Sequence, residues 1–132
     1  MQLPVHALAS TALIEVIRIS ALPDEPGDPY PGEVVAHWTG DAVTRALALI
    51  QTLPAVAQHR CGFRPGWGIR AYQDALERVL LEAAFCFSCH EVRTHGTAVP
   101  AELAKQFFDA DSPPGRALLA LFRDAPPRLP TR

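Results

Sequence analysis

The clearest constraint on the fold is a strict alternation of two kinds of side chain between residues 61 and 72. One set comprises Cys61, Phe63, Pro65, Trp67, Ile69 and Ala71, and the other comprises Gly62, Arg64, Gly66, Gly68, Arg70 and Tyr72. Successive side chains of a β-strand point to opposite faces of a sheet, so this period of two predicts a strand with one set on each face. Pro65 cannot donate a hydrogen bond to a neighbouring strand, which predicts an edge position or a local bulge.

Residues 71–87 carry two patterns at once. A helical spacing joins Tyr72, Ala75, Leu76, Val79, Leu80 and Ala83, whereas a second alternation joins Val79, Leu81, Ala83, Phe85, Phe87 and Cys89. Alanine, leucine, glutamate and arginine favour the helix. The second alternation favours a strand, and we predict this strand, with residues 73–77 as the loop of a β-hairpin.

The hairpin leads to a geometric prediction. With its loop centred on Ala75, Ile69 lies opposite Leu81, and the same register places Cys61 opposite Cys89. Directly opposed side chains on one face have Cβ atoms about 4.5–5.5 Å apart, which is near the separation that a disulfide requires. The other face then collects Arg64, Arg70, Glu82, Cys86 and His90 around a floor formed by Gly62, Gly66 and Gly68.

Shorter signals complete the fold. β-Branched residues predict a central strand over residues 12–20, a proline-rich loop follows at 22–32, and a short strand is expected at 32–38. An apolar stripe at helical spacing predicts a helix from residue 41 to 53, which Pro54 ends. One or two helical turns are expected within residues 100–106. Ser112, followed by two prolines, is typical of the N-cap of a last helix.

This order of elements predicts an α+β fold, with a mainly antiparallel sheet and two or three helices packed on one face. The 132 residues are expected to form a single domain, with residues 126–132 as a frayed tail. The net charge of −2 is too small for strong attraction to nucleic acid or to a membrane surface. We find no run of 18 apolar residues and no targeting segment, and three cysteines are an odd number, so a cytoplasmic location is expected.

The segment Cys86-Phe87-Ser88-Cys89-His90 gathers most of the reactive side chains. Thiolates and imidazoles bind zinc, and the four candidate ligands are Cys61, Cys86, Cys89 and His90, with His59 and His95 as alternative imidazoles. An unbroken strand would send Cys86 and Cys89 to opposite faces, so a zinc site requires the chain to turn near Phe87. No cofactor is expected apart from this candidate zinc ion.

Other interpretations of the same segment stay open. It matches the attachment motif of c-type haem, but the chain offers no export signal and no methionine beyond its first residue. The two cysteines could form a redox dithiol, or Cys86 could act as a nucleophile with His90 or His95 as its base. The simplest interpretation is that Cys61 and Cys89 are small buried hydrophobic residues and that Cys86 is a partly covered thiol.

Polar and aromatic residues outside this segment suggest a binding surface. Its candidate members are Arg64, Trp67, Arg70, Arg93 and His95. Guanidinium groups bind carboxylates and phosphates, and residues 90–95 are expected to form a polar loop beside them. The acidic run Asp109-Ala110-Asp111-Ser112 lacks the spacing of a calcium loop and is better explained as the cap of the following helix.

These features favour a small binding or accessory domain without evident catalytic residues. Its partner would be another protein or a small anionic ligand. A small zinc protein and a thiol-dependent enzyme are the alternative hypotheses.

Two stretches together resemble a loose family of small uncharacterised bacterial proteins. The first runs from Cys61 to the Cys86–Cys89 pair, and the second is Phe108-Asp109-Ala110-Asp111-Ser112-Pro113, which leads into residues 117–119. In that family a lone cysteine opens one strand, a Cys-x-x-Cys closes the next, and a Phe-Asp-x-x-Ser-Pro segment opens the last helix. The resemblance covers residues 60–122, implies the hairpin for residues 71–87, and implies no particular activity. Where this chain has His90, the family has asparagine.

Overall fold

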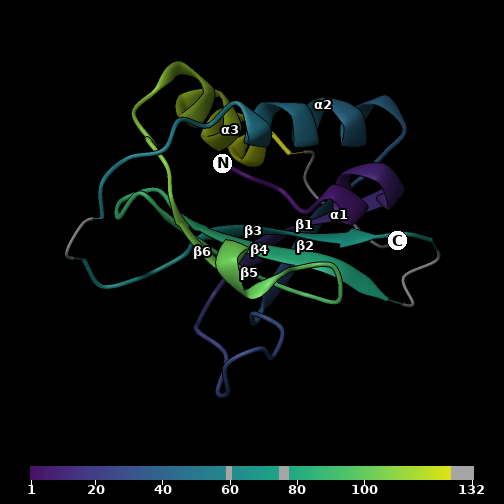
Figure 1. Ribbon diagram of the computed structural model, residues 1–132, viewed down its shortest axis with the longest axis horizontal. Helices are drawn as coiled ribbons and strands as arrows, with labels where there is room; N and C mark the ends of the chain where they lie inside the picture. Colours follow the sequence, from purple (N-terminus) through teal and green to yellow (C-terminus); the bar gives the residue numbers. More distant parts are fainter. Residues whose placement is uncertain (59–60, 75–77, 126–132) are drawn as a thin grey trace, which may run out of the picture.

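The computed structural model describes residues 1–58, 61–74 and 78–125. The described strands are β1 (Leu13–Ile19), β2 (Gly32–Thr39), β3 (Trp67–Tyr72), β4 (Val79–Cys86), β5 (Glu91–His95) and β6 (Lys105–Phe107). They form one sheet in the order β2-β1-β3-β4-β5-β6, and every neighbouring pair is antiparallel. The helices are α1 (Val5–Ser10), α2 (Asp41–Gln51) and α3 (Pro113–Arg123), with a 3-10 turn η1 (Ala101–Leu103). The three α-helices lie over the same face of the sheet (Figure 1), so the predicted α+β fold is confirmed.

The main core lies between the sheet and these helices. Alternation along the strands directs seven completely buried side chains toward the helices: Ile14, Val16, Ile69, Ala71, Leu81, Ala83 and Phe85. The helix α2 presents the predicted apolar stripe of Val43, Ala46, Leu47 and Ile50. Ser112 caps α3 as predicted, because its Oγ accepts a hydrogen bond from the backbone N–H of Gly115 at 3.1 Å.

Loops cover the opposite face of the sheet. The connection between β1 and β2, residues 20–31, hangs from this side (Figure 1). A second, smaller cluster of buried side chains lies here, and its members are Tyr30, Phe63, Ala84, Cys86 and Cys89. Tyr30 comes from the β1–β2 connection and Phe63 from the coil before β3, so two separate segments close over the far side of β4.

In the described part of the ambiguous segment 71–87, residues 79–86 form strand β4, as predicted, and not a helix. Its pairing differs from the prediction, because Ile69 lies opposite Ala83 instead of Leu81. A shift of two residues keeps each side chain on its predicted face, since the side-chain period is two. The predicted hairpin loop at 73–77 lies partly outside the described residues.

The predicted strand over residues 61–72 begins only at Trp67. Residues 61–66 form a coil, and their proline and two glycines explain why no regular ladder forms there. Phe63 and Trp67 were expected on one face, but they lie on opposite sides. Phe63 belongs to the smaller cluster, whereas Trp67 packs against the main core.

One further expectation is wrong. Residues 90–95 were expected to form a loop, yet residues 91–95 are strand β5, paired with β4 and β6. Within residues 100–106, the expected helical turn is the 3-10 turn η1, and strand β6, which was not predicted, follows it. The helix α1 was not predicted at all, and the predicted frayed tail at 126–132 lies outside the described residues.

Phe122 of α3 lies at the centre of the main core. It is completely buried, and its ring centroid lies 5.8 Å from that of Trp67, 6.2 Å from that of Trp38 and 5.6 Å from that of Phe85. Replacing Phe122 with alanine is expected to lower the free energy of unfolding by about 3–5 kcal/mol, because the ring is lost and a cavity remains. The matched control is Leu121→Ala, since Leu121 is 37% exposed. Urea denaturation measures both variants, and equal losses would contradict the observed packing.

Candidate functional site

Five polar side chains form a continuous row across the face of the sheet that the helices leave uncovered. His37 of β2 lies opposite Glu15 of β1, Glu15 opposite Arg70 of β3, Arg70 opposite Glu82 of β4, and Glu82 opposite His95 of β5. Directly opposed residues in a sheet lie close enough for their side chains to interact. The row, which we call the polar row, therefore alternates between basic and acidic groups over five strands.

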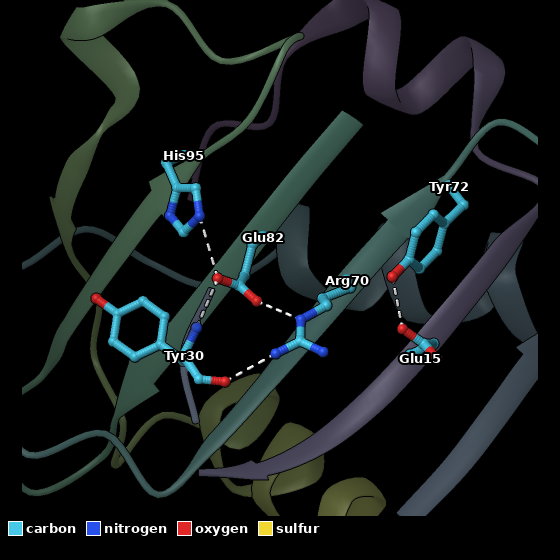
Figure 2. Close-up of polar contacts among 6 residues, drawn as sticks. All are labelled: Glu15, Tyr30, Arg70, Tyr72, Glu82 and His95. Atoms are coloured by element: carbon cyan, nitrogen blue, oxygen red, sulfur yellow. Dashed lines mark hydrogen bonds and ion pairs between the residues drawn. The ribbon is translucent and has the colours of Figure 1, made fainter. Parts of the chain in front are cut away.

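Glu82 is a deeply buried member of the polar row, with a side chain that is 4% exposed. Its Oε1 accepts hydrogen bonds from Nε2 of His95 and from the backbone N–H of Tyr30, each at 3.1 Å, and its Oε2 accepts one from Nε of Arg70 (Figure 2). Arg70 also donates from Nη2 to the carbonyl oxygen of Tyr30 at 2.7 Å. The backbone N–H and carbonyl groups of Tyr30 thus anchor the β1–β2 connection to Glu82 and Arg70 of the polar row.

These contacts decide the charge of Glu82. Burial by itself raises the pKa of the Glu82 carboxyl, but hydrogen bonds from His95, Arg70 and the Tyr30 backbone, together with the guanidinium charge, outweigh this effect. The resulting pKa of Glu82 lies below its ordinary value of 4.5. Glu82 is therefore an anion at neutral pH and balances the charge of Arg70.

Glu15 occupies the other side of the polar row. Its Oε1 accepts a hydrogen bond from the hydroxyl of Tyr72 at 2.6 Å (Figure 2), and its Oε2 lies 3.4 Å from Nε2 of His37. Burial, followed by the hydrogen bond to Glu15, raises the pKa of Tyr72 to about 12. Burial also raises the pKa of Tyr30. Both phenols are therefore uncharged at neutral pH.

A hollow of about 260 Å³ opens beside the polar row, and we call it the row hollow. Its wall is formed by Gly27, Pro29, Arg70, Tyr72, Val79, Glu82, His95 and Gly96. A second hollow of about 390 Å³ shares Gly27 and His95 with it and extends to Arg93. A third depression of about 670 Å³ lies between residues 2–5 and 97–103, and none of its described lining residues is ionisable.

Three of the five predicted binding residues lie on this face. Arg70 and His95 meet at Glu82 and line the row hollow. Arg93 lines the second hollow, pairs with Glu91 at 2.5 Å, and places its guanidinium 4.1 Å from the ring centroid of Phe63. The register therefore brings Arg70 and His95 onto one carboxylate, and Arg93 lies beside them. That these residues form a binding surface stays a prediction.

The other two predicted binding residues lie elsewhere. Trp67 faces the helices and stacks on Phe122, with ring centroids 5.8 Å apart. Arg64 is exposed in the coil of residues 61–66. Arg64 was placed by extending the strand alternation back to residue 61, and the late start of β3 explains its different position. Trp67 follows the alternation itself, which puts it on the face of Ile69 and Ala71 that the helices cover.

The predicted meeting of Cys61 and Cys89 is observed, in the form of a disulfide with Cα atoms 5.6 Å apart. Cys61 is exposed, contrary to its interpretation as a buried hydrophobic residue, whereas Cys89 is buried. Cys86 is a free thiol and completely buried. A disulfide sulfur is not a thiolate, so zinc binding by Cys61, Cys86, Cys89 and His90 stays a prediction that concerns the reduced chain.

His90 lies at the end of the turn between β4 and β5 and holds a different segment. Its Nδ1 accepts a hydrogen bond from the backbone N–H of Ala110 at 3.0 Å, and its Nε2 lies 3.9 Å from a carboxylate oxygen of Asp111. Ligand atoms of His90, Asp109 and Asp111 lie within 4.8 Å of one another, a spacing that could hold a metal ion. However, a neutral imidazole that accepts at Nδ1 carries its proton on Nε2 and offers no lone pair there. This geometry suits an anchor for residues 109–111 better than a metal site.

No protein-family model, curated protein or solved structure matches this chain. None of the helices in the described ranges is both long and apolar enough to cross a membrane. The resemblance to a family of small bacterial proteins stays a prediction. Function therefore has to be inferred from the polar row and the hollows beside it.

Glu82 was expected on the same face as Arg70 but not as a candidate site residue, although the sequence contains a signal for it. Glu82 is the only charged residue between Val79 and Cys89. A glutamate within a buried strand is almost always paired, which predicts basic side chains beside it on the flanking strands. The one donor and one acceptor that the backbone of Tyr30 supplies leave no pattern in the sequence.

We expect Glu82→Gln to lower the free energy of unfolding by about 3 kcal/mol at neutral pH, because Arg70 then loses its buried counter-ion. A carboxyl with a lowered folded pKa contributes stability that is present above its unfolded pKa of 4.5 and is lost as the pH falls through the folded value. The difference between wild type and variant should therefore shrink below pH 4.5. Urea denaturation over a pH series measures it, with the exposed Glu33→Gln as control. A difference that stays constant into strong acid would contradict the pairing.

The two tyrosines of the chain, Tyr30 and Tyr72, should resist ionisation in the folded state. At pH 10, the ordinary pKa of the phenol, we expect little tyrosinate absorbance from folded protein and half-ionisation in denaturant. Stability from these phenols is present below pH 10 and lost as the pH rises through their folded pKa values. Tyr72→Phe isolates the Tyr30 signal. One tyrosinate per folded chain at pH 10, with unchanged circular dichroism, would contradict this environment.

Proposed function

We propose that this chain is a small binding domain that recognises a carboxylate group in the row hollow. The ligand is either a small organic acid or a carboxylate of a partner protein. The observation that carries the proposal is that one buried carboxylate, Glu82, orients both Arg70 and His95 without using all of their hydrogen-bond donors.

The unused donors support binding of a further acceptor. Within the described part of the chain, Arg70 makes two hydrogen bonds, to Glu82 and to the Tyr30 carbonyl, whereas a guanidinium has about five N–H groups. His95 uses Nε2 toward Glu82, so Nδ1 gains a donor role when the imidazole is protonated. Guanidinium and imidazolium groups form strong charge-assisted hydrogen bonds with carboxylates.

The size and the wall of the hollow support a small ligand with an apolar part. Its volume of about 260 Å³ is near the lower end of ligand sites, which run from about 300 to 1,000 Å³. Pro29, Tyr72 and Val79 supply apolar surface opposite the basic groups. Because Arg70 stands on β3 and His95 on β5, and both strands pair with β4, little ordering is required when a ligand binds.

Binding is better supported than proton-transfer catalysis. The lowered pKa of Glu82 and its three hydrogen-bond donors suit a permanent anion, whereas a general acid or base needs a pKa near the working pH. A cytoplasmic location is part of this proposal. In a reducing compartment the Cys61–Cys89 bond would form transiently instead of serving as a permanent crosslink.

The test is a titration followed by nuclear magnetic resonance of the side-chain signals of Arg70 and His95. Propionate and benzoate are the probes for a free acid, and a short peptide is the probe for a protein carboxylate. The matched controls are propionamide, benzamide and the same peptide with an amidated end. We expect saturable shifts with the carboxylates only. Equal shifts with the amides would refute recognition of a carboxylate.

His95→Gln should weaken binding of the effective carboxylate by about tenfold, because a hydrogen bond to a charged group contributes about 1.5–3 kcal/mol. Glutamine keeps a donor for Glu82, so the polar row is retained. The matched control is His37→Gln, which changes the other histidine of the row but not the wall of the hollow. Equal weakening by both variants would place the ligand elsewhere.

A further inference from the structure

The three cysteines of the chain lie in one neighbourhood. Cys61 and Cys89 are joined by a disulfide, and Cys86 and Cys89 both pack in the smaller cluster of buried side chains. The hydroxyl of Ser88 lies 3.4 Å from the sulfur of Cys86 and 4.0 Å from the sulfur of Cys89. A free thiol therefore lies next to a disulfide, with a single hydroxyl in contact range of both.

We propose that Cys61, Cys86 and Cys89 form a thiol–disulfide exchange unit that presents Cys61 as a reactive thiol. The thiolate of Cys86 attacks the sulfur of Cys89, a new Cys86–Cys89 bond forms, and the Cys61–Cys89 bond breaks. The bonding electrons leave with Cys61, which takes up the proton that Cys86 gave to solvent. One disulfide replaces another, so the step requires no external oxidant or reductant.

The local backbone supports this direction of attack. Strand β4 ends at Cys86, and the turn of residues 87–90 carries the chain to Cys89. Because this turn breaks the strand alternation, Cys86 and Cys89 reach the same cluster instead of opposite faces. Two cysteines separated by two residues in a tight turn are typical of a dithiol that can close on itself.

The burial of the sulfurs gives each cysteine a different role. Cys86 is completely buried and Cys89 is 1% exposed, so a solvent reagent cannot reach either sulfur in the folded state. Cys61 is exposed, and it lies in the coil that precedes β3. Exchange therefore converts an inaccessible thiol into an accessible one. The freed Cys61 thiolate can attack a disulfide of a partner, so that a mixed disulfide forms and the second partner sulfur leaves as a thiol.

Downstream of Cys61, the coil is held by contacts that do not involve the disulfide. Phe63 packs in the smaller cluster beneath the guanidinium of Arg93, and the carbonyl oxygen of Gly66 accepts a hydrogen bond from the backbone N–H of Ile19 at 2.9 Å. Loss of the Cys61–Cys89 bond thus releases Cys61 while the segment from Phe63 onward stays attached. The leaving thiolate moves only locally, and the fold does not have to open.

The experiment labels the folded, non-reduced full chain with a maleimide, quenches it in acid, and maps the label and the disulfide by peptide mass spectrometry. We expect the label on Cys61 together with a Cys86–Cys89 disulfide. The labelling rate should level off as the maleimide concentration rises, because internal exchange becomes limiting. The Cys86→Ala variant, which keeps the original disulfide but lacks the attacking thiol, should stay unlabelled.

Two results would overturn the proposal. The first is a label on Cys86 with the Cys61–Cys89 disulfide intact, because that pattern indicates opening of the cluster without exchange. The second is folded wild-type protein that takes up no label over a period in which the denatured chain is labelled. Both are read from the wild-type chain itself, so the test does not depend on the folding of a variant.

Discussion

The carboxylate of Glu82 is buried in the middle of the helix-free face of the sheet, and the polar architecture of that face is arranged around it. Taking a carboxylate and a guanidinium out of water is unfavourable unless each finds well-placed partners. Glu82 meets this condition through three donors from three segments: Arg70 of β3, His95 of β5 and the backbone of Tyr30. The pairing register of three strands and the path of the β1–β2 connection therefore depend on one ionised group.

Tyr30 connects this polar arrangement to the sulfur cluster. Its backbone N–H and carbonyl groups bind Glu82 and Arg70, while its side chain packs with Phe63, Cys86 and Cys89. Apolar packing in the smaller cluster therefore holds both loops that cover the sheet. Hydrogen bonds to Glu82 and Arg70 hold the β1–β2 connection in addition, whereas a disulfide and the Arg93 guanidinium hold the coil before β3.

Much of the fold could be predicted, because side-chain periodicity reports directly on secondary structure. The alternation after Val79 identified β4. The predicted register was wrong by two residues, and a shift by an even number leaves Arg70 and Glu82 on the predicted face. The alternation before Trp67 predicted a strand that is not observed. Pro65 and its neighbouring glycines fit the alternating pattern, but this segment forms no regular strand pairing. Strand β5 was missed because its five residues, Glu91–His95, are mostly polar and read as a loop.

The candidate site was predictable only in part for a related reason. Arg70 and His95 were singled out as separate members of a surface, but nothing in the local sequence links them. Their meeting depends on a cross-strand row that requires β5 beside β4, and β5 was expected to be a loop. By contrast, Cys61 and Cys89 could be brought together from the hairpin alone, although they meet through a coil and a turn instead of paired strands.

The division of the sheet into two faces explains why both proposed activities lie on the same side. The helix-covered face is filled by completely buried apolar side chains, which leaves no room for polar chemistry. The other face carries the polar row, the row hollow and the three cysteines, and loops cover only part of it. The two activities are nevertheless separable. Exchange at Cys89 frees Cys61 but leaves Phe63 packed beside Tyr30, so the backbone of Tyr30 keeps its bonds to Glu82 and Arg70 whichever disulfide is formed.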